Sequence, residues 1–169
     1  GLRTLRFPET GARITSIGER AFSGCVKLET LTLHRLTMLQ TIGADAFSCA
    51  ASTTRAASGG STGGALKGSI YFPPTLVSIG AGAFADQSSL EKIYLHGDVS
   101  SLKTIGAGAF QGCASLYSVA LNEATSGLVI GASAFAGDPK LSSVTLPKSL
   151  ISVGQRAFAQ CTSLASLSL

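Results

Sequence analysis

The sequence predicts a repeat solenoid, mostly β, that coils in the right-handed sense around one parallel concave sheet of about seven strands. Three observations lead to this fold class. An Ala-Phe pair recurs six times, an aliphatic residue followed by Gly stands five positions before each Phe, and a Leu follows each Phe but one by six positions. A self-similar unit of this length cannot bury its apolar residues alone, so successive units stack and share one core.

The strands follow from the segment after each Phe. From the Leu onward, the apolar residues fit L-x-x-[LIV]-x-[LF], whose last two positions alternate as in a short strand with one buried face. We expect the first strand at residues 3–7 and the last at 167–169. The Phe column should anchor the core, and the Gly after each aliphatic residue should let the backbone turn where a Cβ would clash.

The second repeat is interrupted. Between Phe47 and the strand around Ile70 lies a segment rich in Ala, Ser, Thr and Gly. We interpret residues 50–66 as a flexible insertion, dispensable for stability, in which no side chain joins an apolar column. The rest of residues 1–169 should form a single domain of about six repeats, a fragment of a longer chain that is uncapped at both ends.

Read together, the repeat positions resemble a known family. The last complete unit places Leu146-Pro147, Leu150, Val153-Gly154, Ala157-Phe158 and Cys161 in the pattern L-P-x-x-L-x-x-I-G-x-x-A-F-x-x-C, with Val for Ile. This pattern resembles the BspA-like, Treponema pallidum-type leucine-rich repeat over nearly the whole chain. The resemblance implies a leucine-rich-repeat solenoid and a surface or secreted binding protein of a bacterium or protist.

Composition and motifs exclude several function classes. The net charge is +4, but the 13 Lys and Arg are scattered without a run, which argues against nucleic-acid binding. No apolar stretch is long enough to span a membrane. No phosphate-loop, dinucleotide or nucleophile motif occurs, so we expect neither a cofactor nor catalytic residues.

The cysteines and histidines fit a structural role better than a metal site. Cys25, Cys113 and Cys161 stand three residues after their Phe and Cys49 stands two after, with no C-x-x-C pair. We expect buried thiols that cap backbone groups, and only Cys25 and Cys49 belong to adjacent coils that a disulfide could join. His34 and His96 each follow a strand and should lie too far apart to share one zinc ion.

The outward positions of the strands provide the candidate binding site. Tyr71 and Tyr94 should be neighbours on adjacent strands, and Tyr117 extends the row diagonally; tyrosine clusters are frequent on recognition surfaces, although tyrosine also favours sheets in general. The expected partner-binding residues are Tyr71, Tyr94 and Tyr117, with Lys92, Glu91, Arg6, His34 and His96 around the rim.

Two functions are compatible with these features. The first is a non-catalytic protein-binding or adhesion module at the cell surface or secreted, with a protein as partner and a glycan as a second possibility. The second is a structural subunit or scaffold within a larger, intracellular assembly, where low charge reflects surface covered by other proteins.

Overall fold

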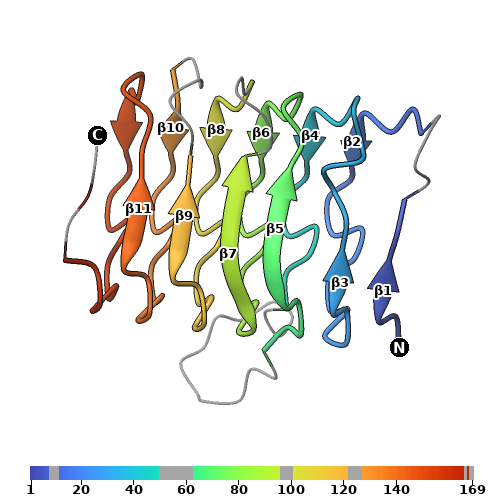
Figure 1. Ribbon diagram of the computed structural model, residues 1–169, viewed down its shortest axis with the longest axis horizontal. Helices are drawn as coiled ribbons and strands as arrows, with labels where there is room; N and C mark the ends of the chain where they lie inside the picture. The colour runs from blue at the N-terminus through green and yellow to red at the C-terminus, as the bar shows by residue number, and fades with distance from the viewer. Residues whose placement is uncertain (8–11, 50–62, 96–100, 122–126, 166, 168–169) are drawn as a thin grey trace.

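The computed structural model describes residues 1–7, 12–49, 63–95, 101–121, 127–165 and 167. In this part of the chain every regular element is a β-strand, and successive coils follow one another from the N-terminal to the C-terminal end (Figure 1). Within the same ranges there is no helix of the length and hydropathy that crossing a membrane requires. The predicted all-β solenoid is therefore confirmed.

Each coil contributes one strand to each of two rows, seen as the lower and upper arrows in Figure 1. The lower row holds the strands expected from the alternating segments: β1 (Thr4–Leu5), β3 (Thr30–Leu31), β5 (Gly68–Phe72), β7 (Leu90–Leu95), β9 (Ser118–Ala120) and β11 (Ser143–Thr145). The upper row consists of two-residue strands: β2 (Ser16–Ile17), β4 (Thr41–Ile42), β6 (Ser78–Ile79), β8 (Thr104–Ile105), β10 (Val129–Ile130) and β12 (Ser152–Val153).

All pairing between neighbouring strands is parallel, but the lower row is not one sheet of about seven strands. It divides into a two-stranded sheet, β1-β3, and a four-stranded sheet, β5-β7-β9-β11. The break falls where the inserted segment rejoins the solenoid. There the β5–β7 register shifts between Gly68 and Ser69, where Glu91 is an extra residue on β7, and the hydrogen bond from Lys67 N to Glu29 O (3.1 Å) links the two sheets. Of the expected last strand, only Leu167 lies in the described residues, and it is not in a strand.

The upper row forms a six-stranded parallel sheet that the sequence reasoning missed. Its strands end on the aliphatic residue of each repeat, and the Gly that follows explains the sheet. A Cβ added to Gly106 would lie 2.5 Å from the backbone nitrogen of Ala81 in the preceding coil. The clash expected at this column is therefore real, but its cause is the contact between coils: Gly106 does not have a positive φ, so no special turn conformation is involved.

The core lies between the two rows and is built from stacked columns. The six phenylalanines form a continuous ladder in which neighbouring ring centroids are 5.1–5.4 Å apart. Phe72 packs edge-on against Phe84 and Phe110 from the lower row. The leucine columns close the core around this ladder, so each coil is stabilised mainly by the coils on either side.

Leu66 corrects the expected extent of the insertion. Its side chain is 1% exposed and belongs to the core, so it supplies the buried leucine that the second repeat lacks at the usual position. The Leu66 amide also lies 3.4 Å from Gln87 Oε1 of the next coil. The repeat is thus resumed at Leu66, before the strand around Ile70. The proposed flexibility of the preceding residues 50–62 lies outside the described residues.

Candidate functional site

Tyr71 and Tyr94 lie side by side on the outward surface of the four-stranded sheet, on its edge strand β5 and the neighbouring strand β7. They are paired in the β5-β7 register, and their rings stack with centroids 5.2 Å apart and planes at 20°. Tyr71 remains 43% exposed. The predicted adjacency of the two tyrosines is confirmed, and it arises because equivalent positions of successive coils lie directly beside one another in a parallel sheet.

Lys92 links this pair to Tyr117. Its Nζ lies 5.1 Å from the centroid of the Tyr117 ring, which is 39% exposed. Hydrogen bonds to the hydroxyls of Tyr117 and Tyr94 raise the pKa of Lys92, so the ammonium group is charged at neutral pH. We expected Lys92 at the rim, but it lies between two of the three tyrosines. Tyr71, Tyr94, Tyr117 and Lys92 are called the tyrosine surface below.

The other expected site residues lie at or beyond the edge of the tyrosine surface. His34 contacts Tyr71 edge-on, with ring centroids 6.1 Å apart. Glu91 is exposed, and its carbonyl accepts a hydrogen bond from the Tyr117 amide at 2.9 Å. Arg6 is exposed just after β1, with β3 between it and Tyr71's strand. His96 lies outside the described residues.

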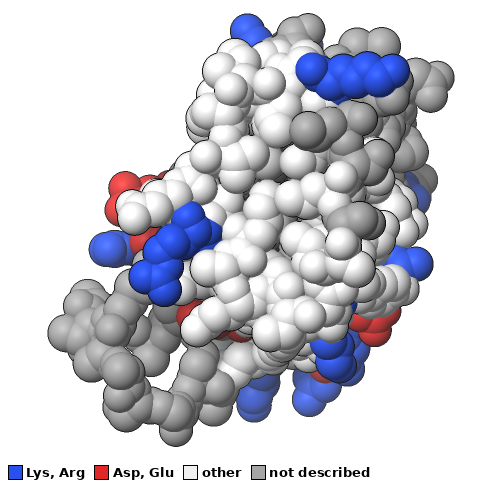
Figure 2. All heavy atoms as spheres, turned by 90° about the vertical axis from the view of Figure 1, so that its left-hand side faces the viewer, with Lys and Arg blue, Asp and Glu red and all other residues white. Residues whose placement is uncertain are grey.

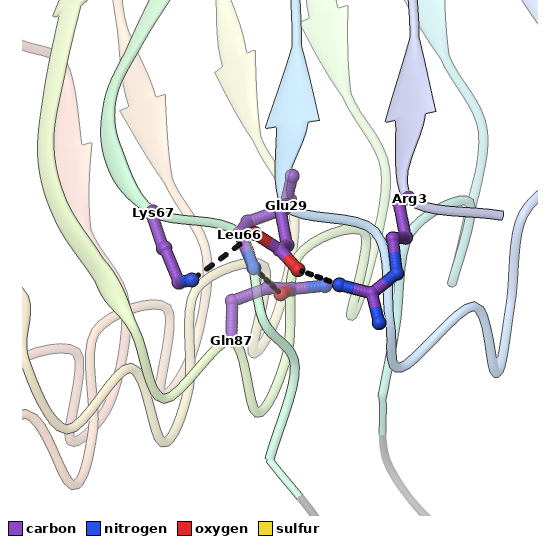
Figure 3. Close-up of polar contacts among 5 residues, drawn as sticks. All are labelled: Arg3, Glu29, Leu66, Lys67 and Gln87. Carbon is purple, nitrogen blue, oxygen red and sulfur yellow. Dashed lines mark hydrogen bonds and ion pairs between the residues drawn. The ribbon is translucent and has the colours of Figure 1, made fainter. Parts of the chain in front are cut away.

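An ion-pair bridge beside the tyrosine surface was not anticipated. Glu29 Oε1 lies 3.0 Å from Arg3 Nη1 and Glu29 Oε2 lies 3.1 Å from Lys67 Nζ (Figure 3). The hydrogen bond from Lys67, with the charges of Lys67 and Arg3, lowers the pKa of Glu29. The three residues come from three successive coils, so the carboxylate bridges the break between the two sheets of the lower row. Each lies far from the others in the sequence, and no short motif could have revealed the cluster.

A buried polar column runs through the interior beside the Phe ladder. Its members stand three residues after the Phe, and three of them donate to the carbonyl of the Phe one coil earlier. Gln87 Nε2 donates to Phe47 O (2.6 Å), Cys113 Sγ to Phe84 O (3.3 Å) and Cys161 Sγ to Phe135 O (3.1 Å). The predicted capping role of the thiols is confirmed. Gln87 and Asp138 share their position in the repeat, and this spacing could have identified both.

Asp138 is the one acidic member of this column in the described part of the chain. Its side chain is fully buried, and Oδ1 accepts a hydrogen bond from the Cys113 amide at 2.8 Å. Burial raises the pKa of Asp138 to about 9, with a further contribution from the negative charge of Asp86. The carboxyl group is therefore protonated at neutral pH and can act as a hydrogen-bond donor, like the other members of the column.

The buried thiols are poorly suited to chemistry. Burial raises the pKa of Cys49 to about 11 and also raises the pKa values of Cys113 and Cys161. A thiol that stays protonated is a weak nucleophile and a poor metal ligand. Cys25 and Cys49 are free thiols rather than a disulfide. Within the described ranges, no group of three or more His, Cys, Asp or Glu side chains could hold a metal ion.

Viewed from the C-terminal end of the solenoid, the middle of the molecule is free of charged side chains among the atoms described, and Lys, Arg, Asp and Glu lie around the rim (Figure 2). Exposed apolar side chains at this end include Ile151, Val153 and Leu167. In inner coils the residues at the position of Val153, among them Ile105 and Ile130, are buried.

Comparison with known proteins agrees with this architecture. A family model described as the BspA type leucine rich repeat region matches six copies over residues 1–60 and 66–165. No curated protein sequence matches the chain.

Three solved structures are similar. A leucine-rich repeat protein of Bacteroides ovatus shares 29% identity with a TM-score of 0.72 over 99% of this chain and 37% of its own. The leucine-rich repeat protein of Treponema pallidum shares 26% identity with a TM-score of 0.68, over 98% of this chain and 79% of its own. A leucine-rich cell surface protein of Faecalibacterium prausnitzii shares 20% identity with a TM-score of 0.52, over 98% of this chain and 46% of its own, and supports the fold alone. The chain thus spans little more than a third of the Bacteroides protein.

Proposed function

Because the chain belongs to the BspA-type leucine-rich repeat family, we propose that it is a non-catalytic protein-binding or adhesion module that binds its partner through the tyrosine surface. Leucine-rich repeat modules generally mediate protein binding, and the repeat family is typically non-catalytic. The family resemblance also supports a place at the cell surface or among secreted proteins. A signal peptide or an anchor encoded in the full gene would be the direct test of that location.

The observation that carries the proposal is the exposed Tyr71–Tyr94 stack with Lys92 beside it. Stacked tyrosines bound to a rigid sheet lose little conformational entropy when a partner covers them, and each ring offers a large contact area. The hydroxyls and the ammonium group provide directional hydrogen bonds at the edge of this area. Surfaces that combine these groups contain the residues that most often dominate binding energy at protein interfaces.

The test compares capture of partners from the native source by the wild-type protein and by a Tyr71→Ala/Tyr94→Ala variant. Each anchor residue of this kind commonly contributes about 2 kcal/mol, or roughly thirtyfold in affinity, so the double variant should recover little of the partner. Met38→Ala is the matched control, because Met38 is a large apolar side chain with 47% exposure outside the tyrosine surface.

Both variants must retain the melting temperature of the wild type within a few degrees for the comparison to hold. If the double variant recovers the same partner in the same amount, the tyrosine surface is not the binding site. If the protein instead co-purifies in fixed proportion with one large complex and the tyrosines do not matter, the scaffold function is correct and the adhesion function is wrong.

A further inference from the structure

The row of outward side chains that contains the two tyrosines ends abruptly. In register across the sheet, Tyr71 pairs with Tyr94, Tyr94 with Ala120, and Ala120 with Thr145. Two large rings are thus followed by the smallest side chain with a Cβ. Ala120 and Tyr94 are both only partly buried, so this step in side-chain size is open to solvent.

The orientation of the two tyrosine rings shows what could occupy the space above Ala120. Because the Tyr71 and Tyr94 rings stack at 20°, one face of Tyr94 is covered by Tyr71 and its other face points along the row, toward the strand of Ala120. Strands in a sheet are about 4.8 Å apart, close to the separation of stacked rings. A third ring placed above Ala120 would therefore continue the stack. Among the described residues, the only ring in contact with Tyr94 is Tyr71.

The positively charged side chain of Lys92 lies on the same face of the sheet as Tyr94. Lys92 precedes Tyr94 by two residues on β7, so both side chains project from the same side of the strand. Its Nζ lies 5.1 Å from the ring centroid of Tyr117, the residue immediately before β9, which is the strand that carries Ala120. Lys92 forms no ion pair with any residue that the structure describes, whereas Arg3 and Lys67 share Glu29. A cation with no acidic partner among the described residues is complementary to a carboxylate.

We propose that the tyrosine surface recognises an acidic segment of a protein partner, which places an aromatic side chain on the open face of Tyr94 above Ala120 and a carboxylate on Lys92. This inference rests on the proposed binding function and specifies its partner. The ring of such a side chain completes a three-ring stack, and the carboxylate of a neighbouring Asp or Glu accepts hydrogen bonds from the Lys92 ammonium group.

The geometry favours a side chain over a sugar. Rings that stack along the row stand edge-on to solvent, so a ligand ring has to enter by one edge and be attached by the opposite one. An aromatic side chain is attached through a single bond and meets this requirement. A sugar within a glycan chain is joined to its neighbours at two positions of the ring, and it stacks best on an aromatic face that is exposed broadly to solvent.

The probe is a blocked acidic peptide with one tryptophan between glutamates. The chain itself contains no Trp, so tryptophan fluorescence reports only the ligand ring. We expect saturable binding accompanied by a shift in emission, and about tenfold or more weaker binding of the same peptide with alanine for tryptophan. Polygalacturonate, an acidic glycan, is titrated in parallel at the same ionic strength and should bind more weakly than the tryptophan peptide.

Two variants test the position of the ring and the charge. Ala120→Phe fills the place above Ala120 with a ring from the protein, so it should remove the preference for tryptophan over alanine. Lys92→Gln should weaken both peptides severalfold, whereas Lys103→Gln, a change of the same charge at an exposed residue beside the upper sheet, should have little effect. If Ala120→Phe does not fold, Tyr94→Ala provides the same test by removing the face on which the ligand ring stacks.

Equal binding of the two peptides, stronger binding of polygalacturonate, or equal loss in the Lys92 and Lys103 variants would overturn the inference. These outcomes are separate from failure of the proposed function. If Tyr71→Ala/Tyr94→Ala abolishes capture of the native partner while Ala120→Phe leaves it unchanged, the surface binds a partner but not through a ring above Ala120. If the double variant also leaves capture unchanged, the proposed function itself is wrong.

Discussion

The upper and lower strands of each coil differ in how strictly their packing restricts the residue type. In the upper sheet, the backbone of each coil lies so close to the next that Gly80, Gly106 and Gly131 each leave no space for a Cβ. In the lower sheet, the outward residue changes from Tyr94 to Ala120 to Thr145 from one coil to the next. The repeat therefore dictates residue type where coils touch and leaves it free where the sheet faces solvent. Departures from regularity on the free side are where a binding site can be found.

The largest expected change in the free energy of unfolding comes from removing a buried aromatic ring rather than an exposed one. Phe110→Ala removes a fully buried ring from the middle of the ladder and should lower the free energy of unfolding by about 3–5 kcal/mol. Tyr94→Ala removes a ring from the two-ring stack on the solvent side, and should cost much less. Urea denaturation of both variants measures the difference. Similar losses would mean that the tyrosine stack serves the fold.

Asp138→Asn should be stabilising at neutral pH, by about 2–4 kcal/mol. Folded Asp138 keeps its proton up to about pH 9, whereas the unfolded chain releases it near the ordinary value of 3.8. Folding at pH 7 therefore requires proton uptake, which Asn avoids while keeping a donor in the column. The Asn amide can also accept the Cys113 N–H bond that Oδ1 accepts now.

The pH dependence gives a second readout of the same group. Since the folded pKa is raised, the contribution of Asp138 to stability is complete below about pH 4, is lost as the pH rises, and levels off above about pH 9. Cys113 and Cys161 face Asp138, and burial raises the pKa of both, so neither thiol accounts for this slope. Urea titrations across this range should show the slope in wild type and not in Asp138→Asn. Parallel profiles would contradict a buried neutral acid.

Gly106→Ala should lower the free energy of unfolding by about 2–3 kcal/mol, because its methyl group meets the backbone of the preceding coil rather than a movable side chain. Gly18→Ala is the matched control: it occupies the same repeat position, but an added Cβ has no atom within 4 Å. Thermal melts of both variants suffice. An equal loss at the two positions would point to backbone conformation, the explanation that we rejected for this column.

Glu29→Gln should have the smallest effect. Both ion pairs of Glu29 involve largely exposed cations, and such pairs contribute little to stability in water. We expect the melting temperature to change by no more than a few degrees and the change to shrink further at high salt. A substantial loss would show that the Glu29 bridge, rather than the core beneath it, holds the two sheets of the lower row together.

The sequence predicted those features that depend only on the spacing of equivalent residues from one repeat to the next. The Phe ladder, the buried thiols and the contact between Tyr71 and Tyr94 all follow once equivalent residues are placed one coil apart. Leu66 could not be found in this way, because the insertion moves it out of the regular spacing. Glu29 was missed for another reason: its partners are set by how the coils stack, and the repeat pattern does not define the positions of long side chains.

Other features were present in the sequence but were overlooked. Ser or Thr followed by an aliphatic residue precedes most of the column glycines, and this recurrence marks the upper sheet. Gln87 and Asp138 stand at the cysteine position of their repeats. Gln87 and Asp138 differ from Cys in residue type, so the cysteine pattern did not include them. All three residue types can donate a hydrogen bond to the preceding coil, and this shared property identifies the column. The role of the tyrosine surface in binding stays a prediction.

The buried thiols also equip the protein with reporters of its own local opening. Cys25, Cys49, Cys113 and Cys161 belong to four different coils, and all are free. A thiol reagent can reach Cys113 only when the contact between its coil and the preceding one, sealed by the bond to Phe84 O, has been broken. Cys25, which is half-buried near the N-terminal end, requires less separation. The order in which the four sulfurs are alkylated would therefore record, coil by coil, whether the stack frays from one end or comes apart as a unit.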